Sequence, residues 1–235
     1  MAATAEYTVR DQDLMKRARR YFEWQYRLAK AQLGARVLEI GCGLGNFTQH
    51  LLDREFVIAV DVEPACISAH RVRFRGRENV ASHCLDVSSP DLLRLRRENP
   101  DSAACLNVLE HIEDDAAALA HIQALLPPDG RVVLIVPAFQ SLYGPIDERL
   151  GHHRRYNKKS LARLAARSGF RTSELRYMNA FGFFGWWFNA HVAHKTKQSE
   201  TQIAIFDAVV VPVLSRLEAL KEPPVGQSLF AVFQK

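Results

Sequence analysis

The sequence predicts an α/β fold in which helices cover both faces of a doubly wound, mostly parallel sheet. Short apolar runs alternate with segments rich in helix-forming residues between residues 35 and 136. The run RVVLIV at 131–136 is almost entirely β-branched and uninterrupted, as expected for a strand that is buried on both faces. Alternation at this spacing favours parallel strands joined by right-handed crossovers.

The composition fits one globular domain. The 235 residues are 48% hydrophobic and 24% charged, which argues against wholesale disorder. The net charge of +5 is mild, so an acidic partner is permitted but not required. Four cysteines, at positions 42, 66, 84 and 105, lack the spacing of a zinc site, and reduced thiols are the simplest interpretation.

Nothing in the sequence indicates export or a membrane span. The first residues, MAATAEYTVRDQD, contain no apolar core of a secretory signal. No apolar run approaches the roughly 18 residues that a spanning helix needs. We therefore expect a soluble, cytoplasmic protein.

The first half of the chain predicts three strands and their helices. Leu14, Ala18, Phe22 and Tyr26 recur at spacing four, which predicts a helix over 13–31 with one apolar face. The following elements are a strand at 35–40, a helix at 47–54, a strand at 57–62, a helix at 66–74 and a weaker strand at 81–87.

The second half continues the alternation and then becomes less regular after residue 137. Ser160 is the expected N-cap of a helix that Gly169 ends. The other expected elements are helices at 91–98 and 114–126, strands at 102–109, 131–136 and 170–181, helices or an insertion at 182–195 and 201–220, and a last edge strand at 228–233.

A glycine-rich turn follows the first strand in EIGCGLGNFT. Gly41, Gly43 and Gly45 let the backbone turn tightly and approach a ligand closely, because no Cβ is present. Their G-x-G-x-G spacing differs from the G-x-G-x-x-G of dinucleotide-binding proteins and disfavours an NAD-dependent dehydrogenase. Asp61 ends the second strand and is suited to ribose hydroxyls, and Asp86 ends the third and is suited to an adenine amino group.

This combination resembles the class I S-adenosylmethionine-dependent methyltransferases. The matching segments are VLEIGCGLGNFT, VIAVDVEP, LDV, LNVLEHIEDD and LLPPDGRVVLIVPA, in the family's order and spacing. The resemblance implies a Rossmann-like seven-stranded sheet with an antiparallel C-terminal edge hairpin strand and helical elaborations at both ends of the chain. It also implies a helical lid at 1–33, a cofactor-binding core at 34–138, and a substrate loop, helical insertion and last strands at 139–235.

The resemblance implies S-adenosylmethionine as the cofactor and assigns its contacts. The methionine part would be held by Glu39 and the glycine loop, with Asn107 beside it. Asp61 would hold the ribose, and Asp86 with the Val87 backbone the adenine. The full expected set is Glu39, Gly41, Cys42, Gly43, Gly45, Asn46, Asp61, Val62, Asp86, Val87 and Asn107.

The residues after the fourth strand bear on the acceptor. Amino-methylating nucleic-acid enzymes carry an N-P-P-Y-like tetrad there, whereas this chain has NVLEH at 107–111. Cys105 lies within the strand and does not form a base-methylating nucleophile motif. We expect a small or lipid-linked acceptor methylated at a hydroxyl oxygen. Nitrogen methylation, an RNA or protein substrate, and a non-catalytic cofactor-binding scaffold stay open as alternatives, with nucleic acid disfavoured.

The segment LGHHRRYNKKSL supplies the expected acceptor site, because loops at the carboxyl ends of parallel strands carry the sites of such folds. His152 or His153 is the expected general base, and Arg154 and Arg155 would hold an anionic group. Tyr156 would order the loop. A solvated turn and a nucleic-acid patch are the structural alternatives. No carboxylate cluster with ligand spacing accompanies the histidines, so no metal is expected.

Three further features are less determined. His111 either contacts cofactor or substrate, with a catalytic role, or helps to cap the next helix. The aromatic stretch at 180–189 forms core beneath a lid, or a substrate wall or homodimer face, or a peripheral membrane contact. Tyr21 and Trp24 are candidates for a lid over the cofactor. The pattern G-H-x-R-R-Y, together with LRYMNAFG and PP-x-GQSL, resembles a bacterial subgroup of these enzymes.

Overall fold

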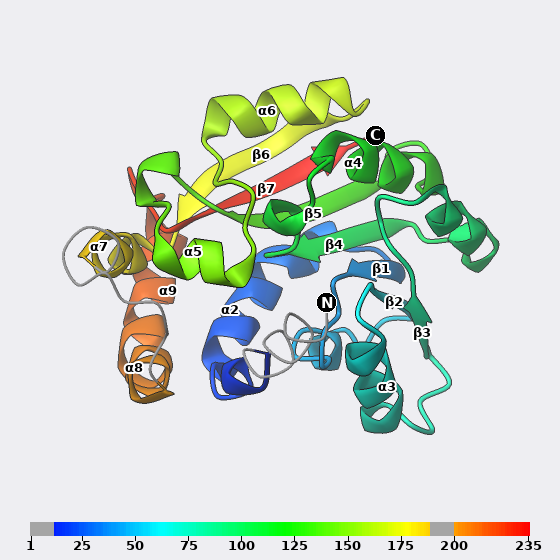
Figure 1. Ribbon diagram of the computed structural model, residues 1–235, viewed down its shortest axis with the longest axis horizontal. Helices are drawn as coiled ribbons and strands as arrows, with labels where there is room; N and C mark the ends of the chain where they lie inside the picture. Colours follow the sequence, from blue (N-terminus) through cyan, green and yellow to red (C-terminus); the bar gives the residue numbers. More distant parts are fainter. Residues whose placement is uncertain (1–11, 189–199) are drawn as a thin grey trace.

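The computed structural model describes residues 12–188 and 200–235. Its described residues form one sheet with the strand order β3-β2-β1-β4-β5-β7-β6 (Figure 1). Strands β1 to β5 run parallel, and β7 runs antiparallel to both β5 and β6. The strands are β1 (Arg36–Ile40), β2 (Phe56–Asp61), β3 (Val80–Cys84), β4 (Ser102–Leu106), β5 (Arg131–Pro137), β6 (Arg171–Met178) and β7 (Ser228–Gln234).

Helices connect the strands and extend the C-terminal half. The α-helices are α2 (Arg19–Ala29), α3 (Pro64–Arg73), α4 (Asp115–Leu125), α5 (Pro145–Leu150), α6 (Lys158–Arg167), α7 (Ala180–Phe188), α8 (Glu200–Ile205) and α9 (Val211–Leu220). A π-helical segment, η7 (Phe206–Val210), joins α8 to α9. Short 3₁₀ helices are η1 (Lys30–Gln32), η2 (Thr48–His50), η3 (Pro90–Glu98), η4 (Leu109–His111) and η5 (Gln140–Leu142).

Two hydrophobic cores lie on the two faces of the sheet. Successive strand residues alternate between them, so that Leu38 belongs to one core and Val37 to the other. Helices α4 and α6 cover the first face, and α2 and α9 cover the second (Figure 1). The doubly wound arrangement predicted from the alternating pattern is confirmed.

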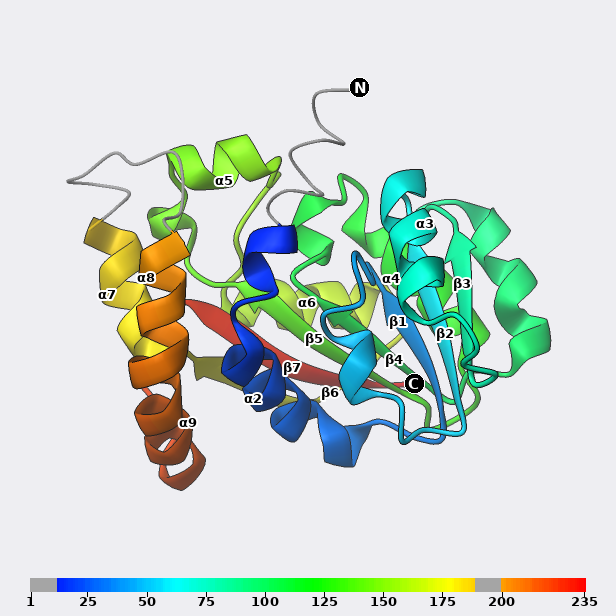
Figure 2. The same cartoon turned by 90° about the horizontal axis from the view of Figure 1, so that it is seen from below.

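The topology brings the loops that follow β1, β2, β4 and β5 to one edge of the sheet, because these strands run parallel. The glycine loop after β1 and the η4 segment after β4 touch there, since Gly41 faces the side chain of Val108. The long connection from β5 to α6, which contains α5, begins at the same edge (Figure 2).

The last strand departs from the expected position. β7 is antiparallel as predicted, but it lies between β5 and β6, and β6 forms the edge. Six of its seven residues are buried, from Ser228 to Phe233. The apolar run SLFAVF was assigned to an edge, yet a run without polar alternation fits an interior strand better.

Several predicted helices differ in extent. The helix expected at 47–54 is only the 3₁₀ turn η2, whose first residue, Thr48, donates to Glu39 beneath the loop. The helix expected at 13–31 is interrupted at 16–18, and α2 begins at Arg19. Asn157, not Ser160, is the N-cap of α6, and Ser160 completes the capping box from the third helical position.

The aromatic stretch is helical but is not core. Among the described residues of α7, four large side chains are about half exposed: Phe181, Phe184, Trp187 and Phe188. The helix was predicted to continue to residue 195, and the part after Phe188 lies outside the described residues. Within the described ranges, no helix has both the length and the apolar character needed to cross a membrane.

Candidate functional site

The glycine loop has the backbone geometry that its sequence implies. Gly41, Gly43 and Gly45 have φ values of 73°, 50° and 80°, which favour glycine. A Cβ on Gly41 would collide with Val108, and one on Gly45 with the Phe74 ring. These residues fit the role of a ligand cradle that approaches a bound molecule through its main chain.

Side chains from neighbouring elements fix the loop. The Gly43 amide donates to Oδ2 of Asp61 at 2.8 Å, and Arg73 donates to the Leu44 carbonyl at 2.8 Å. The Asn46 side-chain amide donates to the carbonyl of Gln12 at 2.9 Å. Residues that precede α2 therefore lie over the loop, whereas Tyr21 and Trp24, the expected lid residues, belong to α2 and pack from it against the core.

A chain of hydrogen bonds lies beneath the loop. Thr48 Oγ1 donates to Oε2 of the buried Glu39 at 2.7 Å and lies 2.9 Å from Nε2 of His70. Nδ1 of His70 lies 2.8 Å from the Ser82 hydroxyl. Burial raises the pKa of Glu39 to about 8 and lowers that of His70 to about 4, so both side chains are mostly uncharged at neutral pH.

The other expected cofactor residues lie at the ends of their strands. Asp61 also accepts from the Glu63 amide, and Val62 is 66% exposed beside it. Asp86 is exposed and accepts from the Ser88 amide, whereas Val87 is buried. Asn107, exposed after β4, adopts a positive φ of 55°. Cys42 is buried within the loop.

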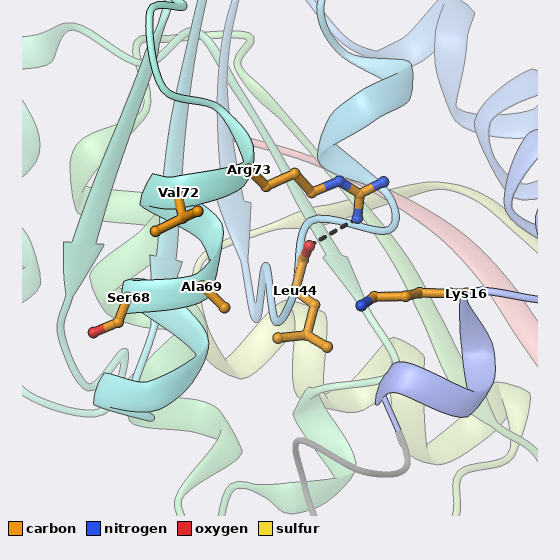
Figure 3. A pocket seen from close by; sticks show the side chains of 6 residues that line it. All are labelled: Lys16, Leu44, Ser68, Ala69, Val72 and Arg73. Carbon is orange, nitrogen blue, oxygen red and sulfur yellow. Dashed lines mark hydrogen bonds between the residues drawn. The ribbon is translucent and has the colours of Figure 1, made fainter.

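A hollow of about 480 Å³ lies on the α3 side of the glycine loop (Figure 3). The residues that line it are Lys16, Leu44, Ser68, Ala69, Val72 and Arg73. None of the expected cofactor residues is among them. The hollow therefore does not coincide with the edge to which Asp61, Asp86 and Asn107 belong.

A second polar centre lies beside the glycine loop, where the β4 and β5 connections meet. Glu110, His111 and His152 each offer a ligand atom, and these atoms lie within 4.8 Å of one another. The rings of His111 and His152 meet edge to face at 4.6 Å. Glu110 is 1% exposed, and its Oε2 has no hydrogen-bond partner.

The members of this cluster differ in burial, because Glu110 is buried, His152 is half-buried and His111 is exposed. Removal from water raises the pKa of Glu110 to about 7, and the charge of His152 opposes that rise. Partial removal of the imidazole from water lowers the pKa of His111, and the neighbouring His152 and His153 add to the effect.

Asp147 holds His152 in place from α5. Its Oδ1 accepts from Nδ1 of His152 at 2.7 Å, and the carboxylate is fully buried. Arg155 donates to both carboxylate oxygens, and Trp186 donates to Oδ2 at 3.3 Å. These partners hold the pKa of Asp147 below its ordinary value despite burial.

The other residues that were predicted as site residues in LGHHRRYNKKSL lie outside this cluster. His153 is exposed and outside the cluster, although its amide donates to the Glu110 carbonyl at 2.8 Å. Arg154 pairs with Asp115, and the Arg155 guanidinium is engaged by Asp147, so neither stands free for an anionic group. Tyr156 is buried and also donates to Asp115, and it orders the loop.

Sequence reasoning did not single out Glu110 or Asp147. Glu110 directly precedes His111 after a buried strand, and that adjacency was an available signal. The absence of a nearby carboxylate was the reason given against a metal at the histidine pair, yet the fold brings Glu110 to His152 across 42 positions of sequence. No spacing rule could have found that contact.

Comparisons with known proteins place this geometry in a family. The sequence matches the methyltransferase domain family over residues 14–175, which is more than half of the chain. It is 34% identical over 101 residues to a ubiquinone biosynthesis O-methyltransferase of Xylella fastidiosa, covering 42% of this chain. It is 28% identical over 169 residues to an uncharacterized 37.1 kDa protein in transposon TN4556 of Streptomyces fradiae, covering 65% of this chain. These matches span 40% and 48% of the two proteins' own lengths.

Solved structures share the fold at low identity. An S-adenosylmethionine-dependent methyltransferase from Mesorhizobium loti superposes with a TM-score of 0.58 at 16% identity, covering 90% of this chain and 98% of that chain. The N-methyltransferase NodS of Bradyrhizobium japonicum, solved with S-adenosyl-L-homocysteine, gives 0.56 at 16% identity, covering 91% and 84%.

The chain belongs to the methyltransferase domain family. Its sheet, with the order 3-2-1-4-5-7-6, confirms the predicted Rossmann-like class. The prediction of a methyltransferase family from the sequence motifs is thereby confirmed.

Proposed function

We propose that this chain transfers a methyl group from S-adenosylmethionine to a hydroxyl oxygen of a small or lipid-linked metabolite. The observation that carries the proposal is the cluster of Glu110, His111 and His152 directly beside the glycine loop. The contact between Gly41 and Val108 joins the two parts of the site. A hydroxyl acceptor needs both an activated methyl group and removal of its own proton, and the site offers a place for each.

S-adenosylmethionine supplies the activated methyl group on a sulfonium. The chain's task is to align the acceptor and to exclude water, and such alignment supplies roughly 7–11 kcal/mol. Glu39 and the Gly41–Gly45 loop would hold the methionine part, and Asp61 the ribose. The acceptor hydroxyl would lose its proton at the imidazoles of His111 and His152.

Two observations support a hydroxyl over a nucleic-acid base. The Xylella fastidiosa relative is named as an O-methyltransferase of ubiquinone biosynthesis. Three of the four basic residues considered for nucleic-acid docking are occupied, because Arg154, Arg155 and Lys158 pair with Asp115, Asp147 and Glu222. The fourth, Lys159, is exposed. Those engaged cations leave less positive charge for a phosphate backbone.

The surface of the C-terminal helices supports a lipid-linked acceptor. Five apolar residues recur every three or four positions and are more than half exposed: Ile205, Val209, Val213, Leu217 and Leu220. Helix α7, with its exposed aromatic residues, lies beside α8 and α9 in both views (Figures 1 and 2). We propose that this apolar surface, defined by those five residues and the four exposed residues of α7, rests on the lipid phase that carries the acceptor.

Titration calorimetry with S-adenosylmethionine and S-adenosylhomocysteine tests the donor half of the proposal. Asp61→Ala should weaken binding by about 1–3 kcal/mol, because a buried hydrogen-bonding group is lost. Since Asp61 also holds the Gly43 amide, Glu63→Ala serves as the comparison for general loosening of this corner. Failure of the parent chain to bind either compound would sink the proposed function.

Methyl transfer from labelled S-adenosylmethionine to a panel of phenolic, alcoholic and isoprenoid-linked acceptors tests the acceptor half. His152→Ala should slow turnover by roughly 10²–10⁴-fold, the contribution of positioned proton transfer, with cofactor affinity unchanged. His153→Ala tests the expectation that either histidine could serve. Turnover confined to amine acceptors would replace oxygen with nitrogen, and tight cofactor binding without any turnover would favour a scaffold.

A further inference from the structure

We propose that Glu110, His111 and His152 form a binding site for a divalent first-row transition metal ion. Each side chain offers one ligand atom, and the three atoms lie within 4.8 Å of one another. Ligand atoms at about 2.0–2.2 Å from a tetrahedral ion lie about 3.3–3.6 Å from one another, so binding an ion would draw the three side chains closer together. Two imidazoles and one carboxylate suit Zn²⁺, Mn²⁺, Fe²⁺ or Co²⁺ better than Mg²⁺ or Ca²⁺.

The unpaired oxygen of Glu110 is an independent indication of a ligand. Oε2 of Glu110 is buried and has no hydrogen-bond partner, and the whole residue is 1% exposed. A buried carboxylate oxygen without a partner is destabilising unless a cation or a donor reaches it. The cluster brings two imidazoles to this carboxyl, that of His111 from the next position in η4 and that of His152 from the connection after β5.

The partner of His152 is that of a metal ligand. Asp147 accepts from Nδ1 of His152 at 2.7 Å, which fixes the tautomer and leaves Nε2 as the free nitrogen. A carboxylate behind the imidazole is a usual second layer of a histidine–metal site.

Arg155 stabilises the fully buried carboxylate of Asp147, which accepts the hydrogen bond from His152. The guanidinium bonds both carboxylate oxygens, and the Trp186 ring covers the guanidinium at 4.9 Å. The Arg155 guanidinium thus provides the counter-charge of Asp147, and Nδ1 of His152 stays paired with that carboxylate.

The chemical role of the ion rests on the proposed function. Three protein ligands leave an open coordination position, as in catalytic zinc sites. An ion there would lower the pKa of an oxygen ligand, to about 7 in the case of water. The acceptor O–H bond would then break and its proton would pass to solvent, because the imidazoles that accept it in a metal-free site would be bound to the ion. The oxygen bonds to the methyl carbon as the carbon–sulfur bond breaks, and sulfur keeps that electron pair.

Cobalt titration of the purified, untagged chain tests the site without any substrate. We expect one equivalent of Co²⁺ with visible d–d absorption and no thiolate charge-transfer band, because the ligands are nitrogen and oxygen. His111→Ala, His152→Ala and Glu110→Gln should each weaken binding by more than the roughly 10–100-fold typical of outer-layer changes. Asp147→Asn should fall within that range.

Matched controls exclude other sites. His83→Ala removes an imidazole that pairs with Glu98 at 3.0 Å on β3, and Cys84→Ser removes the exposed thiol next to it. Both variants should bind Co²⁺ like the parent chain. Circular dichroism confirms that every variant is folded, and Glu110→Gln keeps the shape of the side chain.

Two results would overturn the site. One is the absence of a cobalt spectrum at about 1 mM, which corresponds to binding weaker than about 4 kcal/mol. The other is a spectrum that survives in His111→Ala, His152→Ala and Glu110→Gln alike. If the chain turns over without binding any metal, the metal site is refuted and the proposed methyl transfer stands. If the chain binds metal but methylates no acceptor, the metal site stands and the proposed methyl transfer is refuted.

Discussion

At the scale of single residues, Glu39 is a carboxyl that the fold keeps protonated. It lies beneath the glycine loop with only the Thr48 hydroxyl as a direct partner, and burial raises its pKa to about 8. The unfolded chain releases this proton above about pH 4.5, the ordinary value, whereas the folded protein retains it until about pH 8. The free energy of unfolding therefore falls as the pH rises through that window and is level above it.

Glu39→Gln isolates this contribution, because the amide has the same shape and does not titrate. The stability of the parent chain relative to Glu39→Gln should fall between pH 5 and pH 8 by more than about 1.4 kcal/mol, the value of one pKa unit. Urea unfolding of both proteins at pH 5, 6.5 and 8 measures the difference. Parallel pH profiles for the two proteins would show that Glu39 ionises normally.

At the scale of elements, the C-terminal helices cap helices elsewhere in the chain. Asp207 in η7 accepts from the amides of Arg20 and Tyr21 at the start of α2, which has no side-chain cap of its own. Glu218 in α9 accepts from the amides of Asn179 and Ala180 at the start of α7. Carboxylates at these positions accept hydrogen bonds from amides that have no partner within the helix, and their negative charge interacts favourably with the positive end of the helix dipole.

Asp207→Ala should lower the free energy of unfolding by about 1–2 kcal/mol, the usual value of a lost N-cap. The matched control is Glu55→Ala, which removes a surface carboxylate that pairs with Arg36 while 64% exposed. That control should change stability by less than about 0.5 kcal/mol. Equal effects of the two substitutions in urea unfolding would argue that the cap contributes nothing specific.

At the scale of the whole molecule, α7 connects the candidate site with the apolar surface. The loops after β1, β4 and β5 carry the site, and α7, α8 and α9 extend beyond β6 and β7 (Figure 1). Trp186 joins the two regions, because it belongs to α7 and donates to Asp147 behind His152. A lipid surface under α7 would thus lie close to the loop that orders the acceptor site.

Sedimentation with phosphatidylglycerol-containing vesicles tests the apolar surface. The parent chain should sediment with the vesicles, and Val213→Asp with Leu217→Asp should largely abolish this, because charges enter the interface only at a cost. The same variants should still bind S-adenosylmethionine. Sedimentation velocity without vesicles tests whether the surface is instead a dimer interface. A dimer that the same substitutions dissociate would show that a second copy of the chain covers this surface.

Much of the fold follows from local patterns. The strands at 36–40, 56–61 and 131–137 are mostly apolar, and α3, α4 and α6 carry helix signals in sequence. The prediction for the last strand failed because a distant partner decides its position. β7 is interior because β6 pairs with its outer side.

The sequence by itself determined the parallel sheet, the glycine loop and the acidic strand ends, because each depends on residues close together in the chain. Only the tertiary structure decided that Glu110 and His111 meet His152, and that Asp147 and Arg155 support them. These contacts join the β4 and β5 connections, and sequence spacing carries no information about them. The physical reason is the parallel sheet, which brings the ends of separate strands to one edge.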